Sequence, residues 1–400
     1  MTRAADTIWF QVGLILVIYL YAAASMSILG IVVPLIGPIA ASEHVSPGAI
    51  GSGLSFFAVP AAMASFLFGM VVDRIGVRRA FVLSIAITIA GDAVAVGMPG
   101  VWPFRLGLML CGAGFAFATS SPPVLFMTYL PEERRAKALA FWSTFSPAGY
   151  SGGLLLAIPF LHGGNWGEAF LTHIALMFVV LAVGMAMLRE LAPVAQSQLR
   201  PGLHGRPSAL LVAALGIAVA LPNGIAYGTS LIAPGYLARV HHVSLAASSA
   251  DVALIKIIVM LIGGFIVSLC AGTPRRSRIM FIAMAIVGIA AQIVLLQPTS
   301  TIVTASLGLF LWTFAYSGLS GAGMSLLPVV AGEDRNRGAV AGMVGQFISV
   351  SSVLVPYVYF STTLWTSYLL FAALALTGGS IAVMVVRRNG RSVHPREATI

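Results

Sequence analysis

Three charged side chains lie inside long apolar runs of this sequence, at Asp92, Arg105 and Lys256. Placing a charge at the centre of a lipid bilayer costs at least about 2.5–3.5 kcal/mol, so residues of this kind usually have a function. An ammonium group binds anions, and a carboxylate takes up and releases protons. These residue types therefore indicate anion binding and proton transfer in apolar surroundings.

Lys256 has no acidic neighbour on its own helix face. The nearest acid in the sequence is Asp251, and this spacing turns it roughly 140° away on a helix of about 3.6 residues per turn. A buried lysine without an acid needs a bound anion or a neutral amine. We favour anion binding. A structural lysine that snorkels or bonds to carbonyl groups, and a gating lysine, stay open as alternatives.

Asp92 and Arg105 stand on either side of an expected turn at Gly100. Asp92 lies roughly 12 Å below that turn at about 1.5 Å per helical residue, and the long side chain of Arg105 should reach it across the hairpin. A structural salt bridge is the favoured interpretation. Proton coupling by Asp92 is the alternative, with Arg105 as its partner and Asp251 as a further candidate.

The rest of the composition shows where these residues must lie. Hydrophobic residues make up 59% of the chain and charged residues 8%, against about 25% charged residues in a soluble domain. Runs of about 20 apolar residues cross a bilayer as helices. The sequence predicts twelve of them, near 9–36, 48–72, 80–98, 104–129, 137–160, 167–188, 208–237, 248–271, 278–297, 301–329, 338–360 and 365–387.

The positive charges are sorted between the two sides of these runs. Of the 22 Lys and Arg residues, all but Arg105, Arg239 and Lys256 fall at the termini or at every second junction. The positive-inside rule then places both termini in the cytoplasm of a bacterial inner membrane. The net charge of +10 therefore faces the anionic lipid surface, and no nucleic-acid partner is expected.

The chain divides into two similar halves. We expect a six-helix bundle over residues 1–189, a cytoplasmic linker over 190–207, and a second six-helix bundle with a short tail over 208–400. Acid–acid–arginine turns follow the fourth and the tenth run, and arginine-rich loops follow the second and the eighth. Repeated halves of this kind are typical of one class of membrane transporter.

The segment Gly69 to Arg79 reads Gly-Met-Val-Val-Asp-Arg-Ile-Gly-Val-Arg-Arg. It resembles the signature Gly-x-x-x-Asp-Arg-x-Gly-x-Arg-Arg of the major facilitator superfamily, and the resemblance in length, spans and loops covers the whole chain. It implies an all-α fold of two pseudo-symmetric bundles and transport by alternating access. It also implies a conformational latch, in which the glycines allow close backbone approach and the charges form a cytoplasmic network: Gly69, Asp73, Arg74, Gly76, Arg78 and Arg79.

The branch of the superfamily is less clearly marked. Ser25 stands where many drug–proton antiporters have an acid in their first helix, and Ser146 to Gly153 matches the antiporter motif of the fifth helix only loosely. A cation in the eighth run preceded by an acid is similar to monocarboxylate- and oxalate-type transporters. Lysine replaces arginine here, and the spacing is longer by one residue.

Polar residues of other runs complete a candidate substrate site around Lys256. Asn223 stands out among them, because Pro222 and Gly224 predict an interrupted helix with free backbone groups. The full set is Tyr21, Ser25, Thr119, Tyr150, Asn223, Tyr227, Trp312, Tyr316 and Gln346.

The sequence contains no enzyme motif in the structural context that such a motif requires. Gly149 to Gly153 fits the Gly-x-Ser-x-Gly pattern by its letters, but it lies in an expected membrane helix without a preceding strand. The sequence has no phosphate-binding loop and no zinc-binding helix motif. We therefore expect no enzyme, no cofactor and no metal site.

The favoured hypothesis is a monomeric transporter of a small organic anion and protons. Drug export is the runner-up, and a non-transporting receptor or scaffold is the alternative of another class.

The predicted orientation is testable by labelling. A cysteine introduced at Gly202 should react with a membrane-impermeant maleimide from the cytoplasmic side only, and one at Gly163 from the periplasmic side only. Inverted membrane vesicles provide the matched control, since they exchange the two patterns. Labelling of Gly202→Cys from the periplasm would contradict the charge sorting and every depth derived from it.

Overall fold

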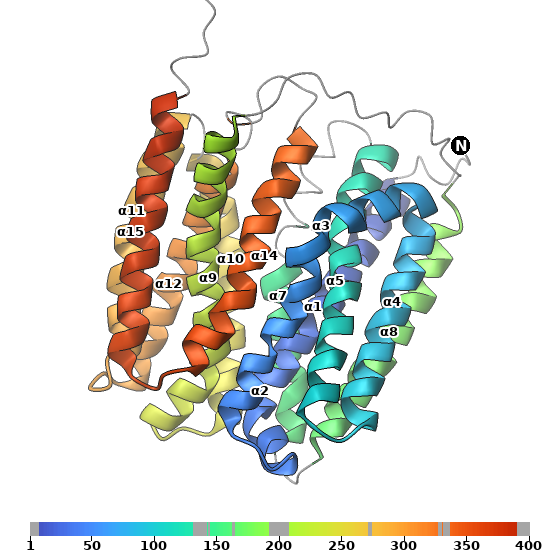
Figure 1. Cartoon of the computed structure of the whole chain (residues 1–400), viewed down its shortest axis with the longest axis horizontal. Helices are drawn as coiled ribbons and strands as arrows, with labels where there is room; N and C mark the ends of the chain where they lie inside the picture. Colours follow the sequence, from blue (N-terminus) through green and yellow to red (C-terminus); the bar gives the residue numbers. More distant parts are fainter. Residues whose placement is uncertain are drawn as a thin grey trace, which may run out of the picture. The chain divides into compact units, whose positions relative to one another are not determined.

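The protein folds as a set of long helices, shown in a computed structural model (Figure 1). The structure describes residues 8–130, 142, 145–161, 165–191, 208–270, 274–326, 330 and 337–389. Its helices are α1 (Ile8–Ser42), α2 (Pro47–Gly53), α3 (Ser55–Ile75), α4 (Val77–Gly97), α5 (Val101–Tyr129), α7 (Phe145–Ala157), the short η1 (Ile158–Phe160), α8 (Trp166–Leu188), α9 (Ala209–Val240), α10 (Leu245–Cys270), α11 (Pro274–Leu296), α12 (Ile302–Met324), α14 (Arg337–Phe360) and α15 (Trp365–Asn389).

Most of these helices can cross a bilayer. Within the described part of the chain, 10 helical segments are long and apolar enough to span a membrane. The two other predicted spans fall on α7, whose described part has 13 residues, and on α10, which has 26 residues. Helices predominate because a backbone in lipid must satisfy its own hydrogen bonds.

The described structure forms two compact units. The first comprises Met1–Leu199, Gly228–Met260 and Val353–Thr363, and the second comprises Arg200–Tyr227, Leu261–Ser352 and Leu364–Ile400. Helices α9, α10 and α14 therefore contribute residues to both. Most of the expected linker at 190–207 lies outside the described residues, so the domain boundary there stays a prediction.

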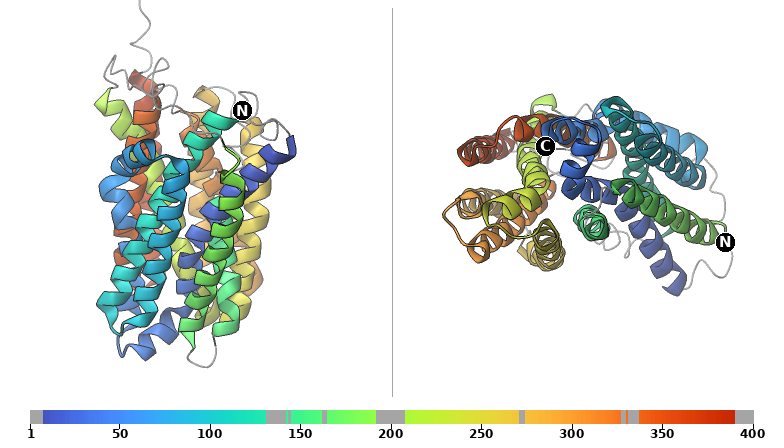
Figure 2. Two further views of the ribbon diagram at one scale, coloured as in Figure 1. Left: turned by 90° about the vertical axis from the view of Figure 1, so that its right-hand side faces the viewer. Right: turned by 90° about the horizontal axis from the view of Figure 1, so that it is seen from below.

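In the first unit, α1 packs backbone to backbone against α7. A Cβ atom at Gly153 would lie 2.0 Å from the carbonyl oxygen of Ser27, and one at Gly30 would lie 2.0 Å from that of Tyr150. Small residues permit this approach, and dispersion forces between the closely packed helices replace the hydrophobic effect that lipid does not supply. Helix α8 packs on α1 and α4, and α4 pairs with α5 (Figures 1 and 2).

The turn between α3 and α4 depends on Gly76. Its φ of +81° and ψ of 153° belong to a region that only glycine enters readily, and its N–H closes α3 by donating to the Val72 carbonyl at 2.9 Å. A Cβ atom there would meet nothing within 4 Å. The expectation of close backbone approach at Gly76 is therefore wrong, because this glycine is required for its backbone conformation.

In the second unit, α11 packs against α12 and α15 (Figure 1). Helix α9 runs unbroken through Pro222, which contradicts the predicted interruption. Proline cannot donate to the carbonyl four residues earlier, that of Ala218. Gly379 of α15 lies against both residues, since its Cβ would be 3.3 Å from the Ala218 oxygen and 3.5 Å from Pro222. Helix α15 thus packs directly on the turn of α9 that contains Pro222, and α9 is helical throughout this turn.

The α1–α7 contact predicts a contrast between two adjacent glycines. Gly153→Ala should lower stability by about 1–3 kcal/mol, because the added methyl group must push two backbones apart. Gly152→Ala is the matched control, since a Cβ at Gly152 meets nothing within 4 Å. Thermal melting of both purified variants in detergent measures the difference. Equal melting temperatures would contradict the packing of α1 on α7.

Candidate functional site

The ammonium group of Lys256 lies between two side chains of the first unit. It projects from α10, donates a hydrogen bond to the hydroxyl of Ser230 on α9, and sits 4.6 Å from the ring centroid of Tyr150 on α7. An aromatic face attracts a cation through its quadrupole, and this attraction strengthens where water is excluded. Three helices therefore converge on one positive charge.

Tyr150 is held in place by the same serine. Its phenol donates to the backbone carbonyl of Ser230, and both residues are buried, at 2% and 6% exposure. Ser230 thus receives a hydrogen bond at its side chain from Lys256 and one at its backbone from Tyr150. The ring is fixed below the ammonium group by this shared residue.

The charge of Lys256 is only partly compensated. Within the described residues it has one hydroxyl acceptor and one aromatic face. An ammonium group has three donors, and the ring face and hydroxyl carry no formal charge to oppose it. The arrangement can accept an anionic group on the remaining donors.

A second polar cluster lies in the second unit. The phenol of Tyr316 on α12 donates to the side-chain oxygen of Asn223 at 2.8 Å, and the Asn223 amide donates to the hydroxyl of Ser352 on α14 at 3.4 Å. Trp312 is buried one turn before Tyr316, with ring centroids 6.3 Å apart. Three of the predicted candidates are therefore neighbours, and this cluster carries neutral hydrogen-bonding groups.

Asp92 has a different partner from the one expected. Its Oδ2 lies 2.7 Å from Nδ1 of His173 on α8, and both side chains are fully buried. The other ring nitrogen of His173 lies 2.9 Å from the carbonyl oxygen of Ala24 on α1. The Cys111 thiol donates to Oδ1 of Asp92 at 3.4 Å. The carboxylate thus belongs to a buried network that joins four helices.

The predicted contact between Arg105 and Asp92 is wrong. Arg105 donates to the Ala49 carbonyl at 3.2 Å, and its guanidinium lies 5.6 Å from the ring centroid of Phe56 and 5.0 Å from that of Trp102. Arg105 stands in the first turns of α5. Its side chain bonds to α2 at Ala49 and lies against one ring of α3 and one of α5. A carbonyl acceptor and two aromatic faces thus hold the guanidinium away from the buried carboxylate, although its Nε has no hydrogen-bond partner in the described structure.

Other predicted candidates pack inside the protein or bond to their own helices. Tyr21 is fully buried, with its ring 4.7 Å from that of Phe81. The hydroxyls of Ser25 and Thr119 donate to carbonyls of their own helices, at 2.9 and 3.0 Å. Tyr227 is half-buried, and its phenol has no hydrogen-bond partner in the described structure. A substrate role for these residues stays a prediction.

The remaining candidates lie on α10, α14 and the signature segment. Gln346 on α14 and Asp251 on α10 are half-buried. In the signature segment Arg74, Arg78 and Arg79 are exposed, while the side chains of Gly69 and Asp73 lie outside the described structure. The latch therefore stays a prediction.

Sequence reasoning missed four residues of these clusters, namely Cys111, His173, Ser230 and Ser352. His173 lies within a predicted apolar run, so the rule that flagged Asp92 would also have found an ionisable histidine there. Ser230 carries no such signal, because a serine in a membrane helix usually bonds to its own backbone. Its role depends on how α9 and α10 pack together.

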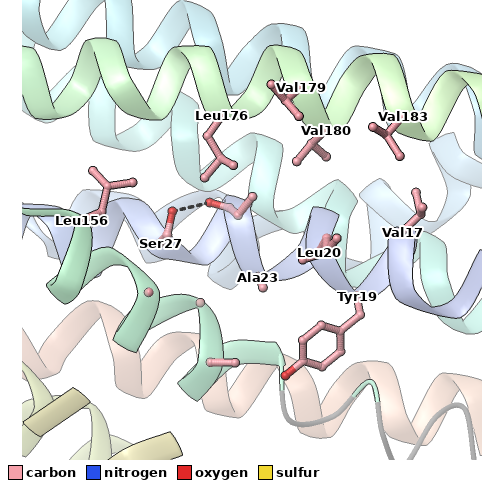
Figure 3. Close-up of a pocket in the computed structure, with 14 residues that line it drawn as sticks. Val17, Tyr19, Leu20, Ala23, Ser27, Leu156, Leu176, Val179, Val180 and Val183 are labelled. Carbon is pink, nitrogen blue, oxygen red and sulfur yellow. Dashed lines mark hydrogen bonds between the residues drawn. The ribbon is translucent and has the colours of Figure 1, made fainter. Parts of the chain in front are cut away.

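An apolar groove runs beside Ala24 along α1, α7 and α8 (Figure 3). Its volume is about 380 Å³, and valine and leucine side chains of α8 line one side of it. Leu20, Val179 and Val183 on its walls are substantially exposed, as expected for side chains that face lipid. Ser27, also in the lining, donates to the Ala24 carbonyl at 2.8 Å.

Comparison with known proteins identifies the fold. Residues 15–356 match the sequence model of the Major Facilitator Superfamily. Two crystal structures of a bacterial homologue of the human lysosomal transporter Spinster, both inward-facing, one occupied and one unoccupied, superimpose with a TM-score of 0.74. They share 14% and 15% identity with this chain and cover 98% of it and 100% of their own chains. No curated protein matches the sequence. The predicted fold class is confirmed.

Proposed function

We propose, from the premise that this chain belongs to the major facilitator superfamily, that it carries a small organic anion across the membrane together with protons. The family and the fold identify a secondary transporter, not an enzyme. The choice of substrate class is ours and rests on the environment of Lys256.

One observation supports an anionic substrate. The Lys256 ammonium group lies on an aromatic ring and a hydroxyl, and no described carboxylate neutralises it. In a medium of low dielectric constant an uncompensated charge attracts an opposite charge strongly. A carboxylate or similar group of the substrate would complete the site, and a cationic drug would be repelled.

The two alternatives make different predictions. Export of amphipathic drugs requires that cationic or neutral solutes be moved in spite of Lys256, and a receptor or scaffold moves no solute at all. Uptake into proteoliposomes under an imposed proton gradient separates the three. The panel consists of labelled lactate, succinate and citrate, with the tetraphenylphosphonium cation as the drug-like probe.

The proposal includes a location and an assembly state. The sorting of arginines supports a bacterial inner membrane with both termini in the cytoplasm. The protein acts as a monomer, with the substrate, protons and the lipid bilayer as its partners. Asn223, Tyr316 and Trp312 are proposed to contact the substrate through hydrogen bonds and an aromatic surface.

Charge selection at Lys256 is the first test. Lys256→Gln should weaken the apparent affinity for the transported carboxylate about 10- to 150-fold, since a hydrogen bond to a charged group contributes about 1.5–3 kcal/mol. Lys256→Arg should keep partial transport, because the charge remains while its geometry changes. Initial uptake rates over a range of carboxylate concentrations give the affinities.

Two controls accompany the Lys256 series. Arg239→Gln removes a positive charge from an exposed position of α9 and should leave the affinity unchanged. Melting temperatures of all variants show whether a loss reflects unfolding. A stable Lys256→Gln protein with unchanged carboxylate affinity would overturn the organic-anion proposal and favour drug export.

The signature segment provides the second test. We propose that Asp73 and the arginines of this segment hold one end state of the transport cycle together. Asp73→Asn should leave the protein folded, with a normal melting temperature, and slow transport severely, because one charge of the network is lost. Asp73→Glu is the matched control and should keep part of the rate. Normal transport by Asp73→Asn would remove the latch.

A further inference from the structure

We infer that the buried pair of Asp92 and His173 is a one-proton switch, which fastens α8 to α1 while the proton is bound and releases α1 when it leaves. The inference rests on the proposed proton coupling and identifies its site. The partner of Asp92 is then His173 on α8. Arg105, the partner expected from the sequence, bonds to Ala49 instead.

The geometry around the imidazole carries the argument. Nδ1 lies 2.7 Å from the carboxylate of Asp92 on α4, and Nε2 lies 2.9 Å from the carbonyl oxygen of Ala24 on α1. Both side chains have 0% exposure. Each ring nitrogen therefore faces an oxygen, and each short contact needs a proton between its two atoms.

Counting protons gives the loaded state. A charged imidazolium donates to the Asp92 carboxylate and to Ala24, or a neutral imidazole donates to Ala24 and accepts from a protonated Asp92. Both forms hold the same number of protons, and both leave the pair with no net charge. The observed arrangement of two short contacts fits this loaded state.

Losing one proton breaks one of the two contacts. A neutral imidazole next to an ionised carboxylate has one N–H for two oxygen atoms, so one lone pair must face an oxygen. The hydrogen bond to the carboxylate is charge-assisted and roughly twice as strong as a neutral one, so it is retained. The Nε2 atom then repels the Ala24 carbonyl, and the contact between α8 and α1 opens.

Opening this contact costs little free energy on the α1 side. The Ala24 carbonyl also accepts a hydrogen bond from the Ser27 hydroxyl at 2.8 Å, so it keeps a partner when His173 leaves (Figure 3). The unloaded pair carries a net charge of −1 in an apolar interior, which is costly without water. Proton loss to water therefore favours a rearranged state in which the pair is hydrated.

Few other ionisable groups face the pair. On α5 the Cys111 thiol donates to Asp92, and Arg105 turns to Ala49. On α1 the phenol of Tyr21 lies one turn before Ala24, with its ring packed on α4. On α8 itself Glu168 is exposed in the first turn and accepts from Asn165. The proton exchange is thus confined to Asp92 and His173.

The released helix is the one that reaches the proposed anion site. At Ser27 and Gly30, α1 is in backbone contact with α7 at Gly153 and Tyr150. The ring of Tyr150 lies under the Lys256 ammonium. A shift of α1 on proton loss must therefore move α7 or open a gap in a contact with no spare space. This contact provides a physical path from the proton to the anion.

Nitrogen NMR of isotope-labelled histidine reads the switch without any substrate. The signals of His173 are those absent from a His173→Gln sample. In a titration from about pH 5 to pH 9, Nε2 of the wild-type protein should be protonated at the acidic end and lose its proton as the pH rises. In Asp92→Asn the amide donates to Nδ1, so Nε2 should stay protonated throughout. A wild-type Nε2 that keeps its proton over the whole range would overturn the inference.

Transport provides the second reading. A proton gradient should no longer drive accumulation of the transported carboxylate by the Asp92→Asn variant. The variant should still exchange labelled carboxylate inside the vesicles for unlabelled carboxylate outside at a measurable rate. Glu168→Gln is the matched control, because it removes an exposed carboxylate of α8 and leaves Asp92 and both contacts of His173 in place. It should keep the wild-type pH profile. Gradient-driven accumulation by Asp92→Asn would contradict the switch.

The two proposals fail in different ways. If the wild-type protein exchanges none of the carboxylates, the proposed substrate class is wrong, and the NMR titration still decides whether the switch exists. If exchange occurs and the titration shows a constant Nε2 proton, the anion proposal stands and the switch is wrong.

Discussion

The backbone contact between α1 and α7 is the constraint around which the first unit is arranged. Lipid provides no hydrophobic force between helices, so stability must come from close packing and from hydrogen bonds between them. Gly30, Gly149 and Gly153 allow carbonyl groups of one helix to approach the other within the space of a missing side chain. The same contact fixes where Tyr150 lies. The position of the aromatic ring under Lys256 is thus a consequence of small residues on its own helix and on α1.

Electrostatics in a low-dielectric interior explains why two polar clusters of the first unit differ in character. Asp92 and His173 satisfy each other, and the histidine uses its second nitrogen on α1. Lys256 has a hydroxyl and a π face, which stabilise a cation without cancelling it. In the mechanism that we propose, one cluster binds a proton and the other binds an anion. A transporter that couples the two movements needs this combination.

Arg105 and Asp92 show how depth in a membrane helix fails to determine a partner. Both residues lie on the two helices that flank the predicted turn at Gly100, yet the arginine bonds to the start of α2 and stacks on Phe56 and Trp102. The guanidinium has a long, flexible stem, so its position follows the best acceptor and ring within reach. The carboxylate is short, and its partners must come from the helices that pack directly against it, which are α5 and α8.

The sequence alone determined the class of the protein, the approximate ends of its helices and the presence of charges in lipid. Composition and the spacing of apolar runs were sufficient, because a bilayer admits few backbone structures. It also singled out Lys256, Tyr150, Asn223 and Tyr316, since polar groups in apolar runs are costly. Only the tertiary structure decided which of them meet. Helix packing brings Ser230 to Lys256 and His173 to Asp92, keeps α9 unbroken at Pro222, and separates Arg105 from its expected partner. These pairings depend on helix rotation and neighbour choice, which no local pattern of residues encodes.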